Sequence, residues 1–81
     1  MKTPEGVKRE KISHLEYCLE KLLLKDNGYN TTEVERLYAY IYRVICEMDK
    51  MNAIDATEYY RNKIYADVRG TLMRFNIELV V

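Results

Sequence analysis

One apolar stripe constrains the fold of this chain more than any other feature of its sequence. Between Val34 and Met51, large apolar side chains recur at alternating steps of three and four residues, the spacing of one face of an α-helix. Tyr38, Tyr40 and Tyr42 alternate as in a strand, but they cover only five positions inside the longer pattern. The stripe therefore predicts a helix over residues 31–51. Its core positions are Val34, Leu37, Ile41, Val44, Met48 and Met51.

Two further segments have a helical period, and each begins at a capping signal. Thr3, which precedes a proline, predicts the start of a helix over residues 4–25, because its hydroxyl can cap free backbone N–H groups. Asp55 with Glu58 predicts a capping box at the start of a helix over residues 56–77. The stripe of the first helix is Ile12, Leu15, Leu19, Leu22 and Leu23, with Cys18 beside it; that of the third is Tyr60, Ile64, Val68, Leu72, Phe75 and Leu79.

Three helices of about 20 residues, joined by loops of about four or five, predict an all-α fold. The expected architecture is an antiparallel up-down-up three-helix bundle, with residues 1–81 forming a single helical domain. A domain of this size buries only about 60 to 65% of the surface that its unfolded chain exposes, so association with a second copy would add stability. We therefore expect the bundle to self-associate.

The composition disfavours several classes of function. Thirteen Lys and Arg balance thirteen Asp and Glu, so no net field concentrates polyanions such as nucleic acids. No apolar run approaches the roughly 18 to 20 residues of a membrane span. Cys18 and Cys46 would lie about 12 Å out of register in the antiparallel pair, beyond the ~7 Å between Cα atoms that a disulfide allows. We expect a soluble, cytoplasmic protein with reduced thiols.

No combination of residues suggests catalysis. His14 is the only histidine, and no Glu-x-x-His motif accompanies the carboxylates of Glu16 and Glu20, as a metal site in a helical bundle would require. The three glycines are isolated, so no glycine-rich phosphate loop is present. We predict a protein with no catalytic residue, metal site or cofactor. The alternative of an enzyme or a small-ligand binder has no supporting motif in the sequence.

The second and third helices have more apolar surface than a bundle core needs. On the second helix, the apolar arc covers roughly 220°, about twice the usual requirement of a surface helix. On the third helix, Gly70 invites an explanation, because glycine inside a helix costs about 0.5 to 1 kcal/mol relative to alanine. We interpret both surfaces as protein interfaces, whereas the alternative is that Gly70 is tolerated and the apolar side chains are scattered. The predicted interface residues are Ala39, Tyr42, Cys46, Tyr59, Ala66, Gly70, Met73 and Ile77.

The predicted function is that of a small non-enzymatic protein–protein interaction or regulatory module, acting as a helical homo-oligomer with an unidentified protein partner. The alternative is a small nucleic-acid-binding regulator. Arg61, Tyr65 and Arg69 repeat every four residues on the third helix, and such a basic and aromatic strip can follow a phosphate backbone. The apolar end of the chain, residues 76–81, either extends the third helix or packs on a partner.

Overall fold

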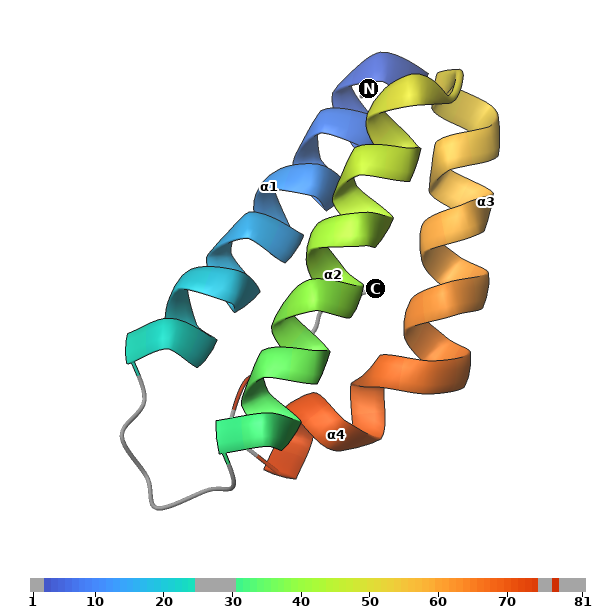
Figure 1. The fold of residues 1–81 in the computed structure, drawn as a ribbon. Coiled ribbons are helices and arrows are strands. Elements are labelled where there is room, and N and C mark those ends of the chain that lie inside the picture. Colours follow the sequence, from blue (N-terminus) through green and yellow to red (C-terminus); the bar gives the residue numbers. More distant parts are fainter. Residues whose placement is uncertain (1–2, 25–30, 75–76, 78–81) are drawn as a thin grey trace.

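The computed structural model describes residues 3–24, 31–74 and 77, without the side chains of Leu24, Thr31, Tyr65 and Ala66. Three main helices contact one another, α1 (Pro4–Leu24), α2 (Thr31–Lys50) and α3 (Ala53–Lys63). The chain continues from α3 through a π-helical turn, η1 (Ile64–Val68), into α4 (Arg69–Arg74). The main helices run in alternating directions, down, up and down in Figure 1. The all-α fold and the three-helix arrangement predicted from the sequence are confirmed.

The start of α1 follows the predicted cap and also closes the end of α2. The backbone N–H of Gly6 donates to Thr3 Oγ1 over 3.1 Å, which satisfies one of the free donors of the first turn. One turn into α1, Lys8 Nζ donates to the carbonyl oxygens of Met51 at 2.7 Å and Asp49 at 3.3 Å. A cation is favourable at a helix C-terminus, so this contact stabilises the antiparallel pairing of the two helices.

The helix α3 begins at Ala53, three residues before the predicted start at residue 56. The N-cap is Asn52, whose side-chain oxygen accepts a 2.8 Å hydrogen bond from the backbone N–H of Asp55, while its amide donates to Asp55 Oδ2. Asp55 therefore takes the position that the capping box had assigned to Glu58, and the prediction was wrong by one turn. The earlier start buries Ala53 and Ala56 in the core. This burial depends on tertiary packing, which the capping residue Asn52 does not reveal in the sequence.

The predicted stripes form most of the core, with one exception on α1. Leu23 is 66% exposed, because Leu22, its neighbour on the helix, already faces the core and lies about 100° away around the helix axis. The predicted core residues Phe75 and Leu79 lie outside the described residues. The buried side chains of the core are Leu15, Cys18, Leu19, Leu22, Leu37, Ile41, Val44, Met48, Ala53, Ala56, Tyr60, Ile64, Val68, Leu72 and Ile77.

The π turn keeps the third stripe aligned with the core. Tyr60, Ile64, Val68 and Leu72 advance in steps of four residues, and in an α-helix each such step overshoots a full turn by about 40°. Over three steps the stripe would rotate away by about 120°. In the π turn the backbone N–H of Arg69 bonds to Ile64 O, a wider repeat, and all four stripe residues are at most 1% exposed. Surfaces drawn on the sequence at a constant 100° per residue therefore do not run straight through this segment.

Arg74 is the last helical residue that the structure describes, and Ile77, the predicted end of the third helix, is not helical. The backbone N–H of Ile77 donates to Leu72 O over 3.1 Å, a closing bond typical of a helix terminus, and returns the chain to the core. Ile77 is only 3% exposed, so its predicted place on an outer surface is corrected. Residues 78–81 lie outside the described part of the chain. That they extend the third helix, or instead pack on a partner, therefore stays a prediction.

Two neighbouring leucines on α1 test this assignment of the core. Leu19 is 8% exposed and Leu23 is 66% exposed, although the sequence places both in one stripe. Leu19→Ala is expected to lower the free energy of unfolding by about 2 to 5 kcal/mol, because it leaves a cavity. Leu23→Ala should change it by less than about 0.5 kcal/mol. Urea unfolding followed by circular dichroism measures both, and equal losses would contradict the fold.

Candidate functional site

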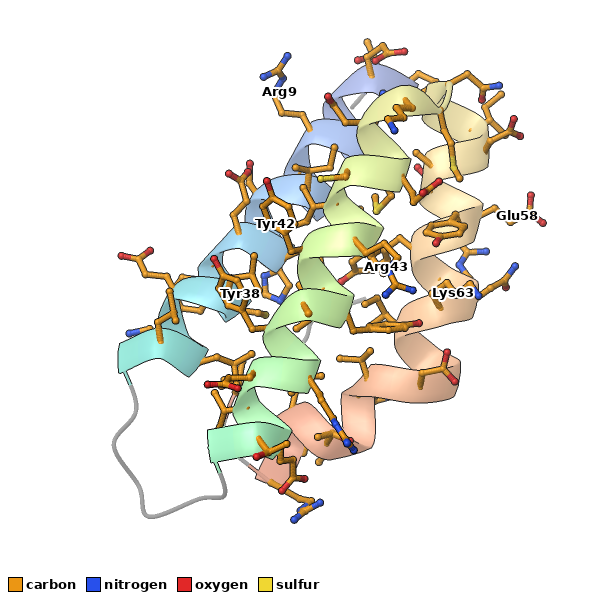
Figure 2. All side chains as sticks on the ribbon, viewed as in Figure 1. Arg9, Tyr38, Tyr42, Arg43, Glu58 and Lys63 are labelled. Carbon is orange, nitrogen blue, oxygen red and sulfur yellow. The ribbon has the colours of Figure 1, made fainter. Side chains whose placement is uncertain are left out.

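One part of the predicted interface lies on one side of α2. Ala39 is exposed, Tyr42 is 56% exposed and Cys46 is half-buried, and the three lie one turn apart in sequence along the helix. Tyr38 and Ile45, both half-buried, adjoin them and pack against the core. We call this set of five residues the Tyr42 surface. Figure 2 shows its two tyrosines on the side of α2 that faces α1.

The ring of Tyr42 is exposed but supported. It stacks on the ring of Tyr38 with a centroid separation of 6.5 Å and an interplanar angle of 9°. Tyr38 is itself partly buried and packs against the core, so the outer ring rests on a supported one. A supported aromatic ring loses little conformational freedom when it is covered, which is a property of anchor residues in interfaces.

Charged side chains of α1 border the Tyr42 surface. Arg9, Ile12 and Glu16 of α1 line a hollow of about 270 Å³ together with Asp49 of α2, which places this flank of α1 toward α2. Glu20 follows Glu16 by one turn on the same flank. The surface therefore has an apolar, aromatic centre and a charged border, an arrangement typical of protein interfaces.

The predicted interface residues of the third helix do not form one continuous surface in the described structure. Tyr59 is half-buried against the core, with the ammonium of Lys63 5.8 Å from its ring centroid. Gly70 and Met73 are exposed, and a Cβ atom added to Gly70 would meet nothing within 4 Å. Ile77 belongs to the core, and the side chain of Ala66 lies outside the described residues. The π turn between Tyr59 and Gly70 changes the rotation per residue, so the two residues do not lie on the single helix face that the sequence predicted.

A tyrosine at the border of α2 and η1 forms a contact that the sequence did not reveal. Tyr40 Oη donates to Asp67 Oδ2 over 2.9 Å. Partial burial of the hydroxyl, together with this hydrogen bond and the negative charge of Asp67, raises the pKa of Tyr40 to about 12. Further along, Arg74 Nη1 pairs with Glu33 Oε1 at 2.8 Å. Both contacts join α2 to the segment that follows α3.

The two cysteines are free and differ in accessibility. Cys18 is fully buried in the core, and its burial raises the pKa of the thiol to about 11. Cys46 is half-buried on the Tyr42 surface. A buried thiol with a raised pKa holds little thiolate at neutral pH, so Cys18 is unsuited to act as a nucleophile.

The remaining candidate groups are the single histidine, the carboxylates and the predicted basic strip. His14 stacks on Tyr17 with ring centroids 6.2 Å apart. In the described part of the chain, no three side chains of His, Cys, Asp or Glu are grouped so that they could hold a metal ion. Of the predicted basic strip, Arg61 and Arg69 are exposed, while the side chain of Tyr65 lies outside the described residues. No described helix is both long and apolar enough to cross a membrane.

Comparison with known proteins assigns no family to the chain. No family model matches it, and no significant match was found among curated proteins or solved structures.

The contact between Tyr40 and Asp67 predicts a loss of stability at alkaline pH. The pKa of Tyr40 is higher in the folded protein than its ordinary value of 10.0. The stabilisation of the fold by the protonated hydroxyl of Tyr40 is therefore complete below pH 10 and is lost as the pH rises toward 12. Tyr40→Phe should therefore flatten the fall in melting temperature over this range, with little effect at neutral pH. Asp67→Asn should flatten it partly. An alkaline profile identical to that of the native chain would contradict the assignment.

The two thiols should react at very different rates. In the folded protein, we expect a soluble thiol reagent to modify Cys46, whereas Cys18 should react only after unfolding. Mass spectrometry of the singly labelled protein, with Cys46→Ser as the matched variant, identifies the site. Rapid labelling of folded Cys46→Ser would show that Cys18 is not enclosed in the core.

Proposed function

We propose that the protein is a small non-enzymatic interaction module that self-associates through the Tyr42 surface. The observation that supports this most is the ring of Tyr42, which is 56% exposed and stacks on the ring of Tyr38. Tyrosine is enriched in interface cores, because a large apolar area is combined with a hydroxyl group that can stay hydrated at the edge. In a chain of 81 residues, covering this ring would add to a small core.

The charges beside the Tyr42 surface favour a second copy as the partner. Lys8 of α1 reaches the carbonyls of Asp49 and Met51, so in the antiparallel pair Tyr42 lies about level with Glu16. Arg9 lies toward one end of α1 from this level and Glu20 toward the other. A twofold axis near Tyr42 would bring Arg9 of each copy toward Glu20 of the other, with tyrosine rings at the centre.

The exposed residues Gly70 and Met73 offer a second contact surface for a different protein partner. Nothing in the described chain packs where a side chain at position 70 would lie, so the fold itself does not require glycine there. Met73 is 60% exposed, and methionine adapts easily to partners of different shape.

Absolute mass by light scattering on a sizing column, at several protein concentrations, tests the self-association. The native chain is expected to reach the mass of a dimer, and Tyr42→Ala to remain a folded monomer. Tyr17→Ala is the matched control, because Tyr17 is 50% exposed on α1 and should leave the dimer intact. A native chain that is monomeric at every concentration would refute the self-association.

A charge exchange tests the twofold geometry separately. Arg9→Glu and Glu20→Lys, each alone, should weaken the dimer because they place like charges opposite each other. The double variant should recover it. If Gly70→Leu dissociates the dimer and Tyr42→Ala does not, the interface lies on α4 instead of α2.

A further inference from the structure

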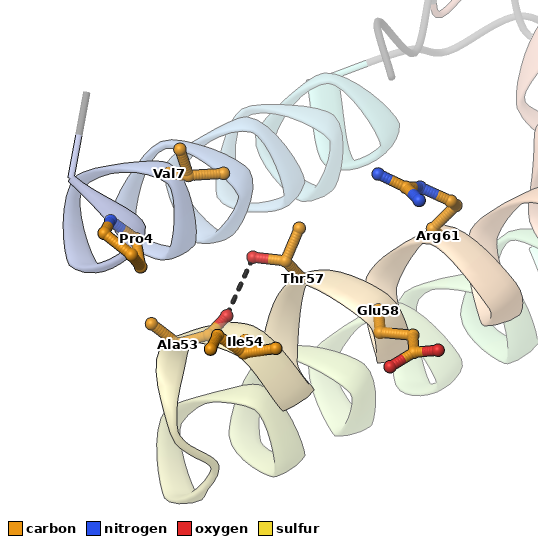
Figure 3. A pocket seen from close by; sticks show the side chains of 7 residues that line it. All are labelled: Pro4, Val7, Ala53, Ile54, Thr57, Glu58 and Arg61. Carbon is orange, nitrogen blue, oxygen red and sulfur yellow. Dashed lines mark hydrogen bonds between the residues drawn. The ribbon is translucent and has the colours of Figure 1, made fainter. Parts of the chain in front are cut away.

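A groove between α1 and α3 combines apolar walls with a cationic end. It has a volume of about 410 Å³ and lies between the first turns of the two helices, away from the Tyr42 surface. Pro4 and Val7 line one side, and Ala53, Ile54 and Thr57 line the other. Figure 3 shows these side chains on facing helices.

The walls of the groove offer apolar contact along their length. Thr57 Oγ1 donates to Ala53 O over 2.8 Å, so its hydroxyl proton is already used and its methyl group faces the space toward α1 (Figure 3). Ile54 is 70% exposed, although it is a large apolar residue. A peptide backbone laid along such walls would lose its hydrogen bonds to water and gain none from these side chains. A hydrocarbon chain has no such hydrogen bonds to lose.

One end of the groove is positively charged. The guanidinium of Arg61 is directed toward α1, and no hydrogen bond or ion pair with the described residues engages it (Figure 3). Glu58 also borders the groove, but its carboxylate points away from α1. Lys11 follows Val7 by one turn of α1, and its ammonium lies 5.0 Å from the ring centroid of Tyr60, the neighbour of Arg61 in sequence. Lys11 does not line the groove, so Arg61 is the cation that borders it.

We propose that this groove binds a single-chain anionic amphiphile, such as a medium-chain carboxylate. The chain would lie between Val7 and Ile54, and the carboxylate would pair with the guanidinium of Arg61, whose planar group matches a carboxylate with two parallel hydrogen bonds. From Ala53 to Arg61 the helix rises about 12 Å, which accommodates an extended medium-length chain. The volume is within the range of small-ligand sites, about 300 to 1,000 Å³. The inference is independent of the self-association.

Titration with sodium decanoate below its micellar concentration, followed by the backbone amide signals in NMR, tests the site. The expected shifts cluster at residues 4–11 and 53–61. Decanol, which has no charge, should bind about fivefold more weakly than decanoate at low salt, and decyltrimethylammonium more weakly still. Shifts centred on the Tyr42 surface, or equal affinity for the three compounds, would overturn the proposal.

Two substitutions with matched controls separate the head group from the chain. Arg61→Gln should weaken decanoate binding about fivefold and remove the preference over decanol, whereas Arg43→Gln, which changes an exposed arginine of α2, should not. Ile54→Glu should abolish binding, whereas Met73→Glu, at another exposed apolar residue, should leave it unchanged. Circular dichroism verifies that each variant is folded. Decanoate binding that survives both Arg61→Gln and Ile54→Glu would refute the site.

A second titration, with a peptide in place of decanoate, tests whether the groove is instead a peptide site. A short peptide with apolar residues next to an aspartate presents the same charge and a similar apolar area. If this peptide binds at residues 4–11 and 53–61 while decanoate does not, the groove is a peptide site and the proposal is wrong. Decanoate binding alone, lost in Arg61→Gln, supports it.

Discussion

The structure depends on the burial of one stripe of the third helical region between α1 and α2. Tyr60, Ile64, Val68 and Leu72 are spaced four residues apart and all are buried, but in a straight α-helix this spacing drifts around the axis by about 40° per step. The chain meets the constraint with a π turn, which rotates the following segment so that the last two residues also reach the core. The position of α4, the closing bond of Ile77 and the contact between Tyr40 and Asp67 all lie beyond or within this turn.

The helix α2 serves the core and the surface at the same time. Its core stripe packs against both neighbouring helices, and Tyr38 extends that packing toward α1. Tyr42, one turn later, continues the same row of rings into solvent. On the other side of α2, the hydroxyl of Tyr40 donates to Asp67, so its proton is already engaged within the fold. Three tyrosines in one short segment therefore have three roles, which are set by about 100° of rotation between successive residues.

The two proposed sites use opposite flanks of α1. The flank with Arg9 and Glu16 lies toward α2, and the flank with Pro4 and Val7 borders the groove of α3. An aromatic centre between unlike charges suits a copy of the same surface, because a twofold axis makes such a pattern complementary to itself. Apolar walls with the guanidinium of Arg61 at one end suit a small anionic amphiphile instead. A partner at one flank leaves the other accessible.

The sequence by itself determined the helices, their order and most of the core, because periods of three and four residues and the cap at Thr3 are local properties of the chain. It also indicated Tyr42 as an exposed anchor. Only the tertiary structure decided the π turn, the burial of Ile77 and the exposure of Leu23, because these depend on how much room the neighbouring helices leave. The groove at Arg61 likewise required the structure, since its walls come from segments about 50 residues apart that the antiparallel packing brings together.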